Sequence, residues 1–209
     1  MPPTSIENIY NDYRTAGEYS PDYALDFFAK NAIPLNNPDA CKDGSELKLY
    51  VELSWQHLNA LYQKYRYNDT ADNAKKYLNI IDSKINQHSQ AFIKDDWYYG
   101  IVLFKGMATY QLRDYKASNT IFKELTEHDS KNDNYKKWLS YSKYGLHLWI
   151  SKTITIVCGL LLLIEIFFKK YIPSFFLNIS FDGIALVGLT GTLIYDYYIK
   201  RSFRKSNQR

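Results

Sequence analysis

Residues 153–168 read TITIVCGLLLLIEIFF, and Glu165 near the end of this run is its only ionisable residue. Together with Trp149 and Ile150, the run approaches the ~20 residues needed to cross about 30 Å of hydrocarbon. Lys152 lies between these two parts, but its long stem allows the ammonium group to reach the membrane surface. The stretch therefore predicts a transmembrane helix.

A second apolar run follows at residues 175–199, with no charged side chain from Gly183 to Tyr195. Pro173 separates the two runs, because proline lacks a backbone donor and restricts the residue before it. Aromatic residues cluster at the edges of the second run, where rings favour the boundary between water and lipid. The two runs predict a two-helix transmembrane hairpin over residues 149–200.

Basic residues flank the outer ends of this hairpin. The tail beyond Ile199 is rich in lysine and arginine and has no acidic residue, and further lysines precede the first run. The positive-inside rule then places both termini in the cytoplasm. We expect a cytosolic domain at residues 1–148 and a basic cytoplasmic tail at 201–209. The alternative is a buried helical hairpin in the core of a soluble protein.

The charge distribution bears on possible partners. Residues 149–209 hold 8 of the 26 Lys and Arg but only 3 of the 22 Asp and Glu, which leaves 18 against 19 in residues 1–148. A nearly neutral soluble part argues against nucleic-acid binding, which needs a basic surface. The basic excess near the apolar runs indicates contact with anionic lipid headgroups.

The N-terminal residues and the cysteines indicate where the chain is located. The start, MPPTSIENIY, has neither the basic nor the apolar part of a secretory signal. Cys41 lies in a loop-like stretch and Cys158 in the first apolar run, so we expect no disulfide, as suits a reducing compartment. The abundance of Asn, Lys, Tyr and Ile is typical of an AT-rich bacterial genome. We therefore expect a bacterial inner-membrane protein.

Apolar residues at helical spacing make the soluble part all-α, with no convincing strand pattern. Thr4 and Glu7 predict a capping box at the start, residues 33–44 predict a loop, and Asp69 or Thr70 predicts the cap of a later helix. The last soluble helix either continues into the first apolar run or breaks at Gly145. The expected helices are Thr4–Gly17, Asp22–Ala32, Ser45–Arg66, Ala71–His88, Lys94–Leu112, Asp114–His128 and Lys131–Leu148.

Residues 113–125, RDYKASNTIFKEL, follow a small residue at Gly106. Small residues at Gly106 and Ser118 allow two helices to approach closely, while larger side chains fill the space beside them. This pattern resembles a tetratricopeptide (TPR) repeat, good over about one repeat and weaker over the two preceding helix pairs. The resemblance implies about three antiparallel helix pairs plus a capping helix. The repeat-packing residues are then Gly106, Tyr115, Ser118, Phe122 and Leu125.

The TPR resemblance also implies a concave groove for an extended or helical peptide, formed by the first helix of each pair. The second and third pairs supply the residues that this resemblance assigns to the groove. These are His57, Leu61, Lys64, Tyr65, Leu103, Met107, Tyr110 and Gln111.

No motif for enzymatic chemistry is present in the sequence. The four histidines lack metal-ligand spacing, and there is no phosphate loop, nucleophile elbow or dinucleotide fingerprint. We therefore expect neither an enzyme nor a protein that needs a cofactor or a metal ion.

Small and polar residues in the apolar runs suggest how the hairpin packs. Ala185, Gly188 and Thr192 form one small face on the second run, which favours close packing of membrane helices. Its partner is either the first run, around Gly159, or another copy in a homo-oligomer. Carboxylates within spans are costly and often functional. Glu165 and Asp182 either form an acidic ring in an oligomer or reach the interface, with Glu165 paired to a lysine one turn on.

These features together predict a membrane-anchored TPR-like adaptor or scaffold that binds a protein partner. The alternative is a membrane effector whose hairpin oligomerises into a pore or disrupts the bilayer, with the repeats as a sensor or assembly module. A third option is a subunit of a larger membrane complex with no separate activity.

Overall fold

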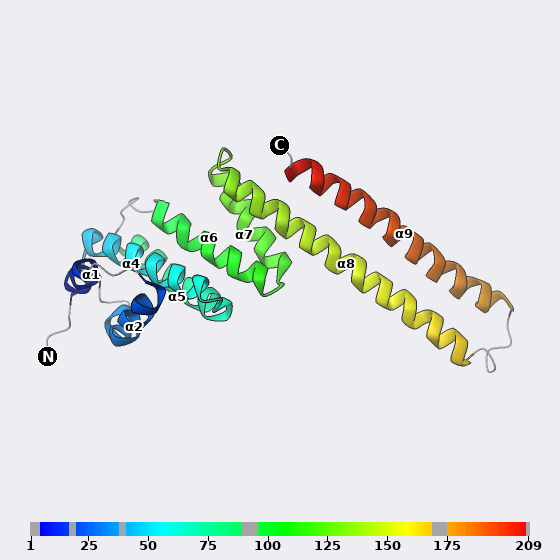
Figure 1. The fold of residues 1–209 in the computed structure, drawn as a ribbon, viewed down its shortest axis with the longest axis horizontal. Coiled ribbons are helices and arrows are strands. Elements are labelled where there is room, and N and C mark those ends of the chain that lie inside the picture. Colours follow the sequence, from blue (N-terminus) through cyan, green and yellow to red (C-terminus); the bar gives the residue numbers. More distant parts are fainter. Residues whose placement is uncertain (1–4, 17–19, 38–40, 89–95, 169–174, 208–209) are drawn as a thin grey trace. The chain divides into compact units, whose positions relative to one another are not determined.

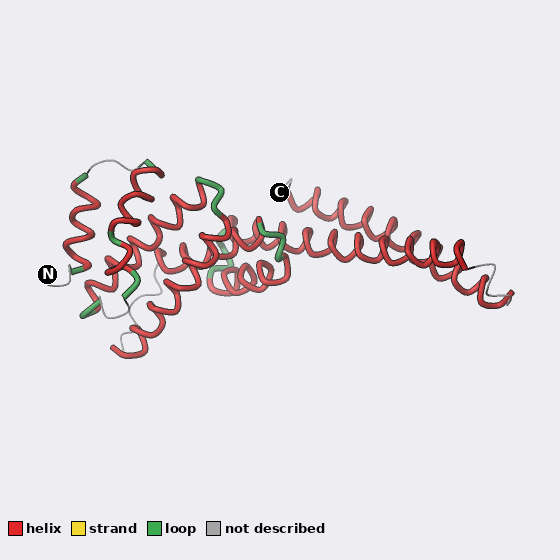
Figure 2. Tube along the Cα trace, turned by 90° about the horizontal axis from the view of Figure 1, so that it is seen from below, coloured by secondary structure: helices red, strands yellow, loops and turns green. Residues whose placement is uncertain are grey.

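The regular structure is helical throughout the part of the chain that the structure describes (Figure 2). This computed structural model describes residues 5–16, 20–37, 41–88, 96–168 and 175–207. The chain divides into two compact units, Met1–Lys136 and Lys137–Arg209. We call them the N-terminal and C-terminal units and describe each by itself. The division between the two units falls between residues 136 and 137, twelve residues before the boundary expected from the sequence at residue 148.

Helices of the N-terminal unit pack mainly against their neighbours in the chain. Helix α4 packs on α5, α5 on α6 and α6 on α7, while α1 and α2 cover α4 (Figure 1). The helices of this unit are α1 (Ile6–Thr15), α2 (Pro21–Lys30), α3 (Ala32–Leu35), α4 (Gly44–Gln63), α5 (Tyr67–His88), α6 (Asp96–Gln111) and α7 (Tyr115–His128).

Side-chain caps begin several of these helices. Ser5 and Ser20 cap α1 and α2, and the Asp43 carboxylate accepts from the first backbone N–H groups of α4. Asp114 accepts from the backbone of Ala117 at the start of α7. Each cap satisfies a donor that has no partner within its helix. Thr4, the cap expected from the sequence, lies outside the described residues.

Two expectations about local structure are wrong. The loop predicted at residues 33–44 contains the short helix α3. Helix α5 begins at Tyr67, so the cap predicted at Asp69 or Thr70 lies within it. The turn before α5 is completed by Tyr65, which has a φ of 58°. This left-handed conformation, uncommon for a non-glycine residue, reverses the chain before Tyr67.

The core of the N-terminal unit lies between α1, α2, α4, α5 and α6. Its largest fully buried side chains in these helices include Tyr50, Leu58, Leu61, Ile81 and Ile101. The Tyr50 hydroxyl donates to the Leu35 carbonyl at 3.1 Å, which satisfies a polar group that burial would otherwise penalise.

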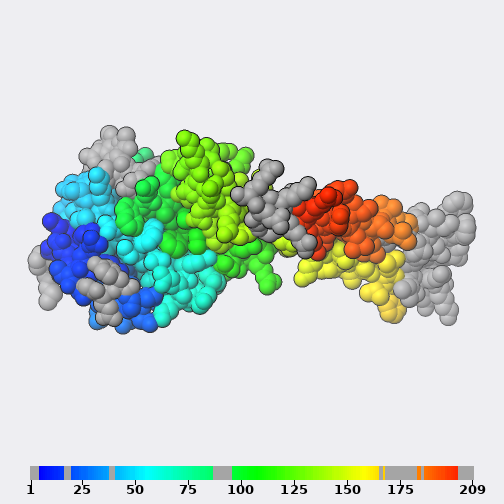
Figure 3. All heavy atoms as spheres, turned by 45° about the horizontal axis from the view of Figure 1, so that its top comes forward, coloured from blue at the N-terminus to red at the C-terminus, as the bar shows by residue number. Residues whose placement is uncertain are grey.

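The C-terminal unit consists of two long helices, α8 (Asp133–Phe168) and α9 (Phe175–Asn207). Its boundary falls within α8, which continues through Gly145 without a break. His147 of α8 contacts Tyr195 of α9, and Cys158 contacts Gly188, so the two helices run antiparallel (Figures 1 and 3). The turn predicted at Pro173 lies outside the described residues.

Within the described residues, one helical segment is long and apolar enough to cross a membrane, Asp133–Ile164. Only 11% of its most apolar 18-residue window is buried. A core helix of a soluble protein would have most of this window covered. The structure thus supports one apolar segment of spanning length.

Candidate functional site

A row of aromatic rings runs between α4 and α6. Trp97 meets Trp55 at a centroid distance of 4.9 Å, Trp55 meets Phe104 at 5.6 Å, and Phe104 meets Tyr62 at 5.7 Å. We call these four residues the aromatic row. A Cβ added at Gly100 would lie 2.5 Å from the Trp55 ring, so glycine is what allows the indole to rest on the α6 backbone.

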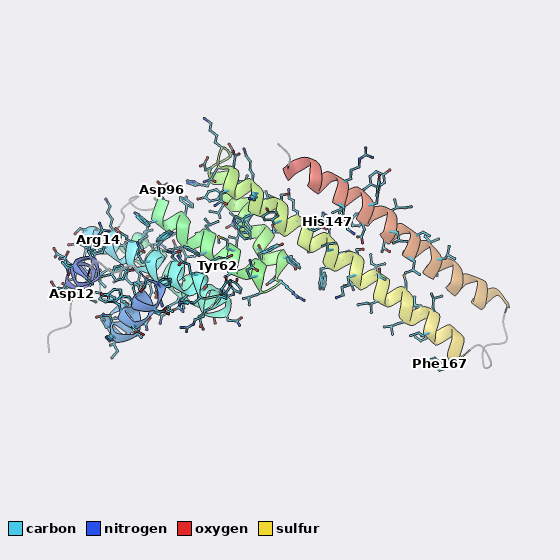
Figure 4. The ribbon with its side chains drawn as sticks, viewed as in Figure 1. Asp12, Arg14, Tyr62, Asp96, His147 and Phe167 are labelled. Carbon is cyan, nitrogen blue, oxygen red and sulfur yellow. The ribbon has the colours of Figure 1, made fainter. Side chains whose placement is uncertain are left out.

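A polar side chain, Gln111, meets the aromatic row at Tyr62, which is labelled in Figure 4. The Gln111 amide donates to the Tyr62 hydroxyl over 3.4 Å, a long bond that links the last turns of α4 and α6. Partial burial raises the pKa of Tyr62 above its ordinary value of 10, so this phenol stays protonated at neutral pH. The row therefore presents rings and uncharged polar groups together.

The residues assigned to the predicted groove are placed in several environments. Leu61 is buried in the core, Lys64 forms a 2.7 Å ion pair with Asp22, and Tyr65 is 78% exposed at the turn. On α6 the half-buried residues of this set are Leu103, Met107 and Tyr110. Gln111 is exposed and lies beside Tyr62. The assignment of a partner to this set stays a prediction.

His57, the remaining groove residue, is packed between helices. Its Nδ1 lies 2.6 Å from the Tyr77 hydroxyl of α5, and its ring stacks on Phe28 of α2 at 4.6 Å. The pKa of His57 is lowered to about 4, mainly by burial and to a smaller extent by the positive charge of Arg66. The imidazole is therefore neutral at pH 7 and links three helices.

A cavity of about 190 Å³ adjoins His57. Apolar side chains of α2 and α3 form one wall. Polar side chains of α4, of α5 and of two residues next to helices form the other wall. The apolar residues are Leu25, Phe28, Ala29, Ala32 and Leu35. The polar residues are Asn36, His57, Arg66, Asn73 and Tyr77.

A wider groove of about 650 Å³ lies among α5, α6 and α7. It is lined by the small side chains of Ala71 on α5 and Ala117 on α7, by Thr109 on α6, and by Leu112, which directly follows α6. Both lysines and acidic residues line it, so it carries no single sign of charge. Sequence reasoning missed this groove, because small and charged residues on an exposed helix face give no pattern of their own.

The five predicted repeat-packing residues lie where α6 and α7 meet. The buried Ser118 hydroxyl donates to the Gly106 carbonyl at 3.1 Å. A Cβ at Gly106 would lie 2.9 Å from the Phe122 ring. Phe122 and Leu125 are fully buried, and Tyr115 meets the Tyr110 ring at 5.4 Å. The structure thus brings these side chains together at one helix crossing.

In the C-terminal unit, the contact between α8 and α9 is narrow. A Cβ at Gly188 would lie 2.5 Å from Cys158 Sγ, whereas one at Gly159 would meet nothing within 4 Å. Ser151 and Thr192 are also buried. His147, labelled in Figure 4, is hydrogen-bonded through Nδ1 to the Tyr195 hydroxyl. Helix α8 therefore meets the small face of α9 at Cys158, the residue next to Gly159.

Three of the predicted membrane residues have side chains outside the described part of the chain. These are Glu165, Asp182 and Ala185. Their proposed roles in an acidic ring or in helix packing stay predictions.

Within the described residues, no group of three or more His, Cys, Asp and Glu side chains is placed to hold a metal ion. Burial raises the pKa of the Cys41 thiol to about 12, which disfavours the reactive thiolate. The expectations of no enzyme activity and no cofactor stay predictions.

Comparisons with protein-family models, with curated proteins and with solved structures found no match.

Proposed function

We propose that this protein is a membrane-anchored adaptor whose N-terminal unit binds a protein partner in the cytoplasm. In this proposal α4 to α7 form TPR-like pairs, and α8 and α9 form a two-span hairpin in the inner membrane of a bacterium. Both ends of the chain then lie on the cytoplasmic side.

The observation that carries the proposal is the exposure of apolar side chains along both helices of the C-terminal unit. Large exposed side chains occur at Ile156, Leu160 and Phe167 on α8 and at Val187 and Leu193 on α9. Burying one such side chain is worth about 1.5–3 kcal/mol. A continuous surface of this kind is unfavourable in water and is the ordinary outer surface of a helix in lipid.

Charge supports the same topology. Lys200 and Arg201 follow the apolar part of α9, and Lys136 and Lys137 precede that of α8. Because the two helices are antiparallel, these basic groups belong to the same end of the pair. Lysine and arginine at one end favour the cytoplasmic side and contact with anionic headgroups.

The aromatic row supports a partner-binding surface in the N-terminal unit. Trp97 is 36% exposed at one end of the row, and Gln111 is exposed at the other. Trp and Tyr are enriched in the energetically important parts of protein interfaces. Because the row's own side chains are rings without charge, we propose an uncharged peptide segment with apolar side chains as its occupant.

Membrane insertion and topology can be tested on the full chain. Cysteines introduced by Lys116→Cys in α7 and Arg201→Cys in α9 provide exposed labelling sites, since both wild-type cysteines are buried. We expect the chain to stay in the pellet after alkaline extraction, and an impermeant thiol reagent to label both sites only in inverted vesicles. Labelling of Arg201→Cys in intact cells would show that the chain has one span. A chain that appears in the supernatant after alkaline extraction would contradict the proposed membrane anchor.

Partner binding is tested by photo-crosslinking. A crosslinker at Gln63, which is exposed near Tyr62, should give one discrete product that Trp97→Ala abolishes. The same crosslinker at Lys116 is the matched control and should not give that product. Equal amounts of the product at both positions would argue against the aromatic row as the partner-binding surface. Dye leakage from vesicles that contain the purified chain would instead favour the pore-forming alternative.

A further inference from the structure

The cavity beside His57 combines an apolar wall with hydrogen-bond donors. It has a volume of about 190 Å³ and lies among α2, α3, α4 and α5, within the N-terminal unit. A water molecule takes about 30 Å³ of liquid, so the space corresponds to roughly six non-hydrogen atoms. This is below the usual range for sites that hold drug-sized ligands.

The hydrogen bond between His57 and Tyr77 fixes which imidazole nitrogen carries the proton. Tyr77 is 3% exposed, and its hydroxyl has one acceptor among the described residues, His57 Nδ1 at 2.6 Å. A buried hydroxyl that does not donate is unfavourable, so we assign the phenol as the donor and Nδ1 as the acceptor. In the neutral imidazole the proton then lies on Nε2, which becomes a donor.

Nε2 has no acceptor among the residues that the structure describes, and the His57 ring lines the cavity. Buried donors normally have a hydrogen-bond partner, either a protein atom or a water molecule. An acceptor atom in the cavity would satisfy this N–H group. The ring itself is held in place by the stacked Phe28 on one face.

Arg66 supplies positive charge at the same wall. Its Nε donates to Asp69 Oδ2 at 2.6 Å, which leaves the two terminal nitrogens of the guanidinium outside that bond. A guanidinium N–H group bonds more strongly to an acceptor that carries negative charge than to a neutral one, so a charged acceptor is favoured at this wall.

The opposite wall has no hydrogen-bonding side chain. Leu25, Phe28 and Leu35 line it and would enclose a short hydrocarbon chain. We propose that this cavity binds a small aliphatic carboxylate, with the carboxylate on His57 and Arg66 and the branched or short chain against α2 and α3. This site is independent of the membrane location and of the aromatic row.

The proposal can be tested with isobutyrate, which has six non-hydrogen atoms. The full chain in detergent micelles, with ¹⁵N-labelled histidine, should show a saturable shift of the His57 imidazole signals, with a dissociation constant in the millimolar range or tighter. Isobutanol and isobutylamine have the same branched chain, with one non-hydrogen atom fewer, and lack the negative charge. Both should bind at least tenfold more weakly.

Two arginine variants separate the site from general charge effects. Arg66→Gln should weaken isobutyrate binding at least tenfold while the chain keeps its helical circular dichroism, because Arg66 is exposed and its ion pair with Asp69 is short-range. Arg14→Gln is the matched control, since Arg14 also faces a carboxylate, Glu52, but does not line the cavity. It should leave the affinity unchanged.

Absence of a saturable shift at tens of millimolar isobutyrate would overturn the proposal. So would equal binding of isobutanol or isobutylamine, or equal weakening by the two arginine variants. An acetylated tripeptide that ends in leucine tests the source of the carboxylate. Binding of isobutyrate alone indicates a free acid, and tighter binding of the peptide indicates a peptide C-terminus.

Discussion

The two units share two kinds of helix–helix contact, but these contacts lie in different environments. Each has a histidine bonded to a tyrosine of another helix, His57 with Tyr77 and His147 with Tyr195. Each also has a glycine beneath a larger side chain, such as Gly100 under Trp55 or Gly188 under Cys158.

What differs is the environment of these contacts. Around His57 and Gly100 the neighbouring side chains are buried, with Leu58 and Ile101 fully enclosed. Beside Gly188, Val187 is 71% exposed, and Leu160 of α8 is 53% exposed. A glycine contact therefore sets how closely two helices approach, whereas the flanking residues decide whether the pair belongs in a water-excluding core or in lipid.

A lysine in the middle of α8 should have the largest effect on this difference. If the C-terminal unit spans a membrane, Leu160→Lys costs about 3 kcal/mol of insertion free energy. On a helix exposed to water, the same change is worth about 0.5 kcal/mol or less. We expect a clear loss of the chain from alkaline-washed membranes.

The matched control for this test is Leu112→Lys, because Leu112 is 40% exposed in the N-terminal unit. Its membrane fraction should equal that of the wild type. A Leu160→Lys chain that stays in the washed membranes at the wild-type level would show that the exposed apolar surface does not face lipid.

The His57–Tyr77 pair should make the stability of the N-terminal unit depend on pH. The pKa of His57 falls from 6.5 to about 4 on folding, so the unfolded chain binds more protons between these values. Stability is then lost as the pH falls below 6.5, by about 2 kcal/mol at pH 5. The loss levels off below pH 4.

His57→Gln should remove this part of the pH dependence, measured as the free energy of unfolding of the full chain in micelles from pH 7 to pH 5. Asn59→Gln, on the same helix, adds no titrating group and should keep the wild-type slope. Parallel curves for His57→Gln and the wild type would mean that His57 titrates normally in the folded protein.

The glycine contact between α8 and α9 should give the smallest effect. Gly188→Ala places a Cβ against Cys158 Sγ and should weaken the pairing by about 1–2 kcal/mol. At Gly191 an added Cβ meets nothing within 4 Å, so Gly191→Ala is the control. The measurement is oxidative cross-linking between cysteines introduced at His147 and Tyr195. Equal cross-linking yields in both variants would show that Gly188 does not lie in the contact between α8 and α9.

Local sequence signals predicted much of the N-terminal unit correctly. The helices expected at residues 94–112 and 114–128 are present as α6 and α7, within a few residues at each end. Their meeting point at Gly106 and Ser118 follows from residue size at fixed spacing. Helix periodicity and small residues act over one or two turns, so they can be read from the chain directly.

What the sequence did not predict lies where contacts between distant segments decide. The TPR resemblance assigned His57 to the groove, but nothing in the residues around position 57 predicts that its ring stacks on Phe28 of α2. The start of α5 was misplaced because Tyr65 takes a left-handed conformation that sequence propensity disfavours. The cavity beside His57 likewise needs α2, α3, α4 and α5 together.

The sequence by itself determined the helical class, the apolar stretch at residues 153–168 and the basic residues after 199, because these depend on composition and on periodicity along the chain. Only the tertiary structure decided that α8 continues through Gly145, that Cys158 meets Gly188 and that His57 stacks on Phe28. The physical reason is that burial depends on which helices meet, and residues far apart in the sequence control those meetings.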